Sequence, residues 1–198
     1  MRHLTKGIAV LVVASLALFV GACNKAPAEA ALKAADQALA AAKPEIEKYV
    51  PEEFASLSSA VQAARSEFEK GNYTEALKAA QDLPAKIQAA TTAAAAAKEK
   101  LIASWTEMSG SLPGLMQSVT AKVTALAAAK SLPKGITKDA LAGAQTDVAA
   151  VTQAWTDAAA AFQGGDVPKA VKTAEDVKAK VQALAEKLGV TSVPAATK

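Results

Sequence analysis

The chain has 198 residues, 52% hydrophobic but only 4% aromatic, and a formal net charge of +3 at pH 7. About a quarter of the residues are alanine, which has the highest helix propensity because it loses no side-chain entropy in a helix. This composition predicts an all-α protein with a core of Ala, Leu and Val. It provides no strongly basic surface, so we expect no nucleic-acid partner.

The only histidine, His3, and the only cysteine, Cys23, lie at the amino terminus. The rest of the sequence therefore lacks the residues of a Ser-His-Asp or Cys-His nucleophilic site and of a zinc site built from His or Cys. Glu52 and Glu53 stand at a predicted helix start, where carboxylates complement the helix dipole. We expect no enzyme, no cofactor and no metal site.

Residues 1–22 combine a basic start, MRHLTK, an apolar run, GIAVLVVASLALFV, and two small residues. The run is short for a membrane span, so we predict a signal peptide that is cleaved. The residues Val20, Gly21, Ala22 and Cys23 resemble the lipobox of bacterial lipoproteins. This resemblance implies acyl chains on Cys23, which then anchors the protein to a membrane. A plain secreted protein cleaved near Ala22 is the alternative.

Asn24 follows the cysteine, and residues 23–27 are predicted to form a lipidated linker. The lipoprotein resemblance implies that a residue other than Asp at this position permits export to the outer membrane. We therefore expect a lipid-anchored protein on the periplasmic face of the outer membrane.

The strongest internal signal is a repeat at an offset of 94 residues. Segment 68–90, FEKGNYTEALKAAQDLPAKIQAA, aligns without gaps on 162–184, FQGGDVPKAVKTAEDVKAKVQAL, with ten identities. Apolar positions at the three-and-four spacing of a helix face recur at the same offset. In the first copy they are Phe54, Leu57, Val61, Ala64, Phe68, Tyr73, Leu77, Ala80, Leu83 and Ile87.

Each copy contains a predicted helical hairpin with a short turn. Gly71 and Gly165 stand where a helix closes with a left-handed residue. Asn72 and Asp166 are predicted caps of the following helices, and Glu75 completes a capping box with Asn72. A connection this short makes the two helices antiparallel.

A further helix precedes each hairpin, so we predict an antiparallel helical bundle of two tandem three-helix units, residues 28–103 and 112–188. The last helix of the first unit contains Pro84, which predicts a kink. Gly, Ser and Pro mark a connector at 104–111 and a break that extends to Gly114, and 189–198 is predicted to be a flexible tail.

The first unit, with its YVPEE segment, its FEKGNY turn and its TEALKAA helix start, resembles the DUF4398-like helical domains of bacterial envelope lipoproteins. The turn also resembles that of tetratricopeptide repeats (TPR), although the 34-residue period and the signature Trp and Pro positions are absent. The resemblance implies TPR-like hairpins and carries no catalytic residues.

One apolar cluster near the predicted connector is a possible interaction patch or small-molecule cleft, although we prefer burial against the neighbouring unit. Its members are Trp105, Met108, Leu112, Leu115 and Met116.

We expect a non-enzymatic scaffold or protein-interaction module of the cell envelope, with an unidentified protein partner. The alternative is a carrier or sensor of a lipid or other apolar small molecule between Ala-lined helices. Covalent attachment of Lys198 to peptidoglycan is a weaker alternative, suggested by a small lipoprotein that also ends in lysine. The apolar helix faces leave the oligomeric state open, because they fit helical bundles within one chain and coiled coils between chains.

Overall fold

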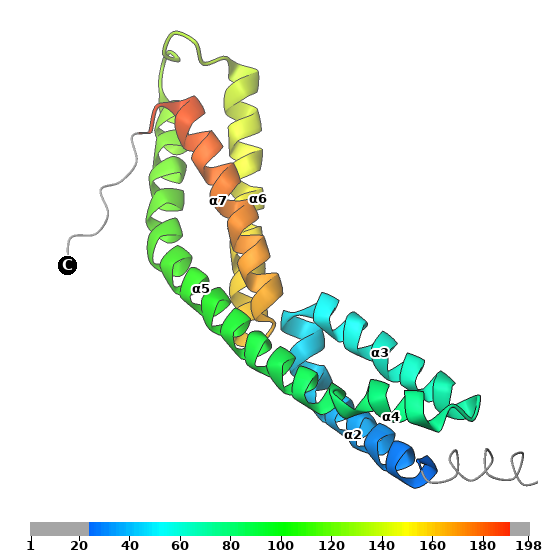
Figure 1. Ribbon diagram of the computed structural model, residues 1–198. Helices are drawn as coiled ribbons and strands as arrows, with labels where there is room; N and C mark the ends of the chain where they lie inside the picture. Colours follow the sequence, from blue (N-terminus) through cyan, green and yellow to red (C-terminus); the bar gives the residue numbers. More distant parts are fainter. Residues whose placement is uncertain (1–23, 191–198) are drawn as a thin grey trace, which may run out of the picture. The chain divides into compact units, whose positions relative to one another are not determined.

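The structure is a computed structural model that describes residues 24–190, and within that range it consists of α-helices joined by short connections, with no strand (Figure 1). The all-α expectation is thereby confirmed. The chain divides into two compact units, unit 1 (Met1–Ala97) and unit 2 (Lys98–Lys198). The predicted signal peptide 1–22, the lipidation site Cys23 and the terminal Lys198 lie outside the described residues.

Unit 1 contains α2 (Lys25–Tyr49), α3 (Pro51–Glu69), α4 (Tyr73–Gln81) and the first part of α5 (Leu83–Ala128). Helix α2 packs against both α3 and α4. All four helices contribute buried side chains to one core, which is made of Leu32, Ala35, Ile46, Leu57, Val61, Ala64, Ala80, Leu83, Ile87, Ala90 and Ala94. The predicted apolar stripes therefore form a core that alanine methyl groups complete.

The predicted linker at 23–27 is wrong from Lys25 onward, because these residues belong to α2. Lys25 is the first residue of the helix, and Asn24 is already fixed, because its Nδ2 donates a hydrogen bond to Thr74 Oγ1 at 2.9 Å. Pro27 does not prevent this, since the first-turn N–H groups of a helix have no partner within the helix. Ala28 is fully buried, which draws the first turn onto the core.

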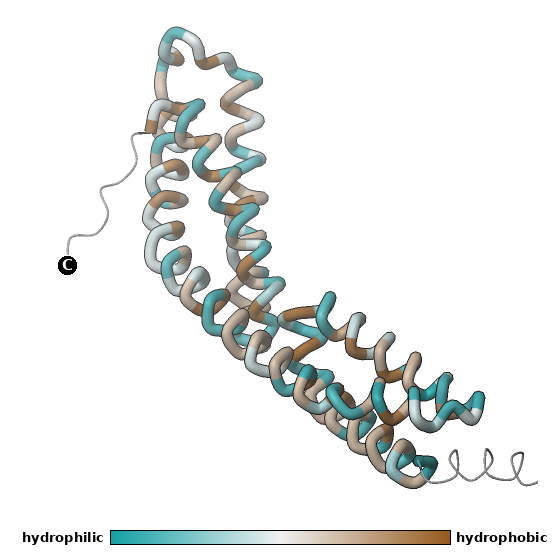
Figure 2. The backbone as a smooth tube through the Cα atoms, in the orientation of Figure 1, coloured by the Kyte–Doolittle hydropathy of each residue, from teal (hydrophilic) through white to brown (hydrophobic). Residues whose placement is uncertain are grey.

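Unit 2 contains the rest of α5, then α6 (Lys138–Gln163) and α7 (Val167–Leu188). Helices α6 and α7 lie side by side (Figure 1). Helix α6 begins after Thr137, and the Thr137 side chain caps it by accepting a hydrogen bond from Ala140 N. Figure 2 shows teal and brown residues alternating along α7, so this helix is amphipathic and directs one face into the core.

The predicted break at 104–114 is wrong, because α5 is helical through all of these residues. Trp105, Met108, Leu112 and Met116 follow one another at helical spacing and are all buried. A glycine in a helix costs only about 1 kcal/mol relative to alanine, so burial of this face outweighs the unfavourable composition. The division into units falls at Ala97, within this helix.

The turns of the two hairpins have the same local structure. Gly71 and Gly165 have positive φ values of 84° and 79°, which confirms the predicted left-handed glycines. Their amides donate to the carbonyls of Phe68 and Phe162, at 3.0 and 2.9 Å. Both connections are therefore tight, glycine-dependent turns.

The caps after these turns differ. Asp166 accepts a hydrogen bond from Lys169 N at 3.4 Å, as an N-cap does. The prediction that the Asn72 side chain caps the following helix is wrong, because this side chain makes no capping hydrogen bond. Instead, Asn72 Nδ2 donates to Glu67 Oε2 at 2.7 Å, which withdraws the side chain from the helix start.

The helix that follows Asn72 is interrupted rather than merely kinked. Helix α4 ends at Gln81 and α5 begins at Leu83, with Pro84 in its first turn. Proline is favourable there, because its fixed φ suits a helix start and its missing N–H has no partner to lose. The predicted kink within one continuous helix is therefore wrong, because the chain has a helix boundary just before Pro84.

Candidate functional site

The predicted patch of Trp105, Met108, Leu112, Leu115 and Met116 is core rather than surface. Leu115 is half-buried and the other four are buried. An exposed interaction patch at these positions is therefore wrong. The residues are buried as we expected, but the stacking partners of Trp105 lie within the same unit.

The partners of Trp105 come from α6. Its ring stacks on Trp155, with centroids 5.3 Å apart and planes at 7°, and on Phe162, with centroids 4.7 Å apart and planes at 10°. Trp155 and Phe162 are half-buried. The aromatic cluster thus stabilises unit 2 internally.

Unit 1 has a surface groove of about 380 Å³ between α3 and the first turns of α5, which we call the unit 1 groove. Glu53 lies on the α3 side and Lys86 on the α5 side, and both are exposed. The remaining lining residues are small or apolar, namely Ser56, Leu57, Ala89, Ala90 and Ala93. The groove is therefore a shallow apolar surface with one negative and one positive edge.

Unit 2 has a corresponding groove of about 190 Å³ between α6 and α7, the unit 2 groove. It is lined by Asp147, Ala150, Lys180, Ala183, Leu184 and Lys187. Each of these positions lies 94 residues after a position that lines the unit 1 groove. Both units thus have a groove with an acidic and a basic edge at positions 94 residues apart.

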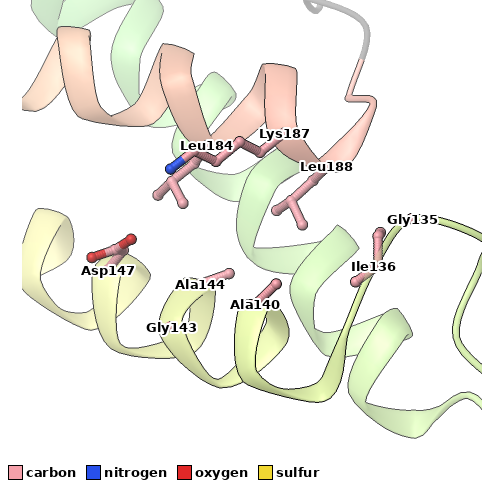
Figure 3. Close-up of a pocket in the computed structure, with 9 residues that line it drawn as sticks. All are labelled: Gly135, Ile136, Ala140, Gly143, Ala144, Asp147, Leu184, Lys187 and Leu188. Atoms are coloured by element: carbon pink, nitrogen blue, oxygen red, sulfur yellow. The ribbon is translucent and has the colours of Figure 1, made fainter.

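The unit 2 groove continues into a larger hollow of about 420 Å³ toward the loop before α6 (Figure 3). Leu184 and Leu188 of α7 point toward Ala140 and Ala144 of α6 across this hollow. Gly143 adds space, because nothing lies within 4 Å of where its Cβ would be. The hollow is apolar except for the Asp147 and Lys187 side chains at its edge.

The groove charges have no ion-pair partner among the described residues. Glu53, Lys86, Asp147 and Lys180 take no part in the salt bridges of this part of the chain, which include Lys43 with Glu47, Arg65 with Asp36, and Lys70 with Glu67. The charges are therefore free to meet charges of opposite sign on a bound molecule. Their exposure on the helix surface suits contact with a bound molecule.

The turn of unit 1 carries a carboxylate with a shifted pKa, that of Glu67. Hydrogen bonds from Asn72 Nδ2 and then from Lys70 Nζ, at 2.7 Å each, lower the pKa of Glu67 below its ordinary value. The Glu67 side chain is half-buried, and its hydrogen bonds hold the turn between α3 and α4 together. Its role is therefore local structure.

The sequence alone does not identify the grooves as binding surfaces, although it contains a signal for them. Glu53 with Asp147 and Lys86 with Lys180 keep their charge at the 94-residue offset, outside the apolar stripe. Charges that recur in register without a packing role mark a repeated surface. What the sequence did not show is that these two positions face one groove.

No family model, curated protein or solved structure matches this chain. Among residues 24–190, no helix has the length and apolarity needed to cross a membrane, and no three His, Cys, Asp or Glu side chains gather as metal ligands would.

Proposed function

We propose that this chain is a non-enzymatic, lipid-anchored lipoprotein of the bacterial cell envelope that acts as a scaffold or protein-interaction module at the periplasmic face of the outer membrane. The observation that carries the interaction role is the groove that occurs at equivalent positions of both units. A surface with small side chains at its floor and charges at its edges accepts a helix closely and orients it through those charges.

The tandem arrangement belongs to this proposal. The matching turn hydrogen bonds, the matching apolar register and the matching grooves support two copies of one TPR-like helical unit. Two equivalent sites on one anchored chain would raise the overall affinity for a partner with two binding segments, since the second contact is intramolecular.

The anchor at Cys23 rests on the lipobox resemblance. Because Asn24 is bonded to Thr74 and α2 begins at Lys25, acyl chains on Cys23 would be joined to unit 1 without an intervening linker. Two or three acyl chains hold a protein stably at a membrane, whereas one binds reversibly.

The anchor is tested by the intact mass of the membrane-extracted protein, compared with a Cys23→Ala variant. We expect a chain that begins at Cys23 and carries diacylglycerol and acyl mass, and a variant that leaves the membrane fraction. An unmodified wild-type chain would overturn the anchor, while leaving the grooves as they are.

The interaction role is tested by placing a photo-crosslinking amino acid at Ala93 or Ala183, one in each groove, and at Ala63 of α3 as an exposed control. We expect discrete protein–protein adducts from the groove positions in cells and none from Ala63. Equal adduct formation at all three positions would show that the grooves are not binding surfaces.

A second candidate, a carrier of an apolar small molecule, is favoured by the hollow beside Leu184 and Leu188, whose volume of about 420 Å³ is in the usual range for ligand sites of ~300–1,000 Å³. Native mass spectrometry of the protein from its host distinguishes the two. A retained lipid that is lost in a Gly143→Leu variant, which fills the hollow, supports the carrier; an unliganded mass supports the scaffold.

A further inference from the structure

We propose that the unit 1 groove binds the same groove of a second copy of this chain, so that two copies form a symmetric dimer. The inference rests on the proposed role of the groove as a protein-binding surface, and it does not depend on the lipid anchor. The occupant proposed for the unit 1 groove is thus a second copy of the same chain.

The argument begins with the charges at the edges. Glu53 is on the α3 side and Lys86 is on the α5 side, and neither has an ion-pair partner in the described part of the chain. A two-fold rotation about an axis that runs along the groove places α3 of one copy over α5 of the other. Each Glu53 then faces a Lys86, so the groove is its own electrostatic complement.

The floor of the groove permits the required close approach. On the α5 side it consists of Ala89, Ala90 and Ala93, whose side chains are single methyl groups. Helices pack at the short end of the interaxial range of about 8–10 Å where the contact residues are small. On the α3 side Leu57 supplies a larger apolar side chain, which is itself 7% exposed.

The unit 2 groove offers an internal comparison. It has Lys187 at the position equivalent to Ala93, so that Asp147 is set against two lysines and the groove has a surplus positive charge. Two copies of this groove would repel each other under the same rotation. We therefore assign self-association to unit 1 alone.

The test uses charge reversal in the full chain, extracted in detergent and studied by sedimentation velocity. Glu53→Lys gives a groove with two positive edges and Lys86→Glu gives one with two negative edges. Since a dimer contains each pair twice, we expect either variant alone to dissociate at least about tenfold more readily, which corresponds to ~1.4 kcal/mol. Ala93→Lys, which gives unit 1 the charge of unit 2, is expected to weaken the dimer as well and does not alter the first turn of α3.

Co-expression of the two charge-reversed variants gives a more specific test of the pairing between Glu53 and Lys86. The two charge-reversed variants, differently tagged and co-expressed, are expected to co-purify with each other in preference to themselves, because their grooves are again complementary. Asp147→Lys and Lys180→Glu, the equivalent changes in unit 2, serve as controls that leave association unchanged. Circular dichroism checks that every variant remains folded.

Three results would overturn the inference: a wild-type chain that sediments as a monomer at every concentration, a dimer insensitive to the unit 1 changes, or failure of the variant pair to associate. If the dimer fails while Ala93 still crosslinks to a different protein, the second copy is excluded and the interaction role remains.

Discussion

Replacing Trp105 by alanine is the change that we expect to destabilise unit 2 most. The Trp105 side chain is 8% exposed and stacks on both Trp155 and Phe162. A buried tryptophan removes about 150–250 Å² from water, and at ~25 cal/mol per Å² this gives about 4–6 kcal/mol. That figure is an upper bound, because an unfolded chain already buries part of its apolar surface. We therefore predict a loss of about 3–5 kcal/mol in the free energy of unfolding, as for other large-to-small core substitutions.

The assay is urea unfolding followed in parallel by circular dichroism and by tryptophan fluorescence. Both tryptophans of the chain lie in unit 2, so fluorescence reports this unit, and the Trp105→Ala variant retains Trp155 as its reporter. Ile102→Ala, at a neighbouring position of α5 that is 38% exposed, is the matched control and is expected to cost less than about 1 kcal/mol. A loss below about 1 kcal/mol for Trp105→Ala would refute the reasoning, because the stack would then contribute no more than an exposed residue.

Three further predictions concern the turns and the long helix. Gly71→Ala and Gly165→Ala should each lower the free energy of unfolding by about 1–2 kcal/mol, because both glycines have positive φ and only the backbone strain, not a clash at the Cβ position, opposes the change. Thermal unfolding measures the two losses, which we expect to be similar. Unequal losses would show that the two turns differ. Pro113→Ala should stabilise unit 2 by up to about 3 kcal/mol, because Pro113 lies inside α5 and donates no hydrogen bond; a lower melting temperature would contradict this. Asn72→Ala should return the pKa of Glu67 toward its ordinary value in a carboxyl NMR titration. Since the pKa of Glu67 is lowered by folding, its contribution to stability is present above its ordinary pKa and lost as the pH falls through the lowered value, and Asn72→Ala should flatten that dependence.

The local features of this protein were determined by its sequence. Alanine content and three-and-four apolar spacing predicted the helices, and every member of the repeated apolar stripe from Phe54 to Ile87 is buried or half-buried. Gly71 and Gly165 predicted the two turns, because a left-handed residue is a property of the chain within a few residues. Helix periodicity and turn glycines depend on neighbouring residues of the chain, and they require no contact with residues far away in the sequence.

Three features were decided only by tertiary structure. Residues 104–114 are helical because Trp105 and Met108 are buried, and the stacking partners of Trp105 are 50 and more residues away in the chain. Helix α2 begins at Lys25 because Asn24 and Ala28 meet the rest of unit 1. The grooves exist because packing sets Glu53 opposite Lys86 across two helices. Helix propensity acts over about one turn of helix, whereas the burial of a side chain depends on which helix faces pack together. At these three places the free energy of burial outweighed the local propensity.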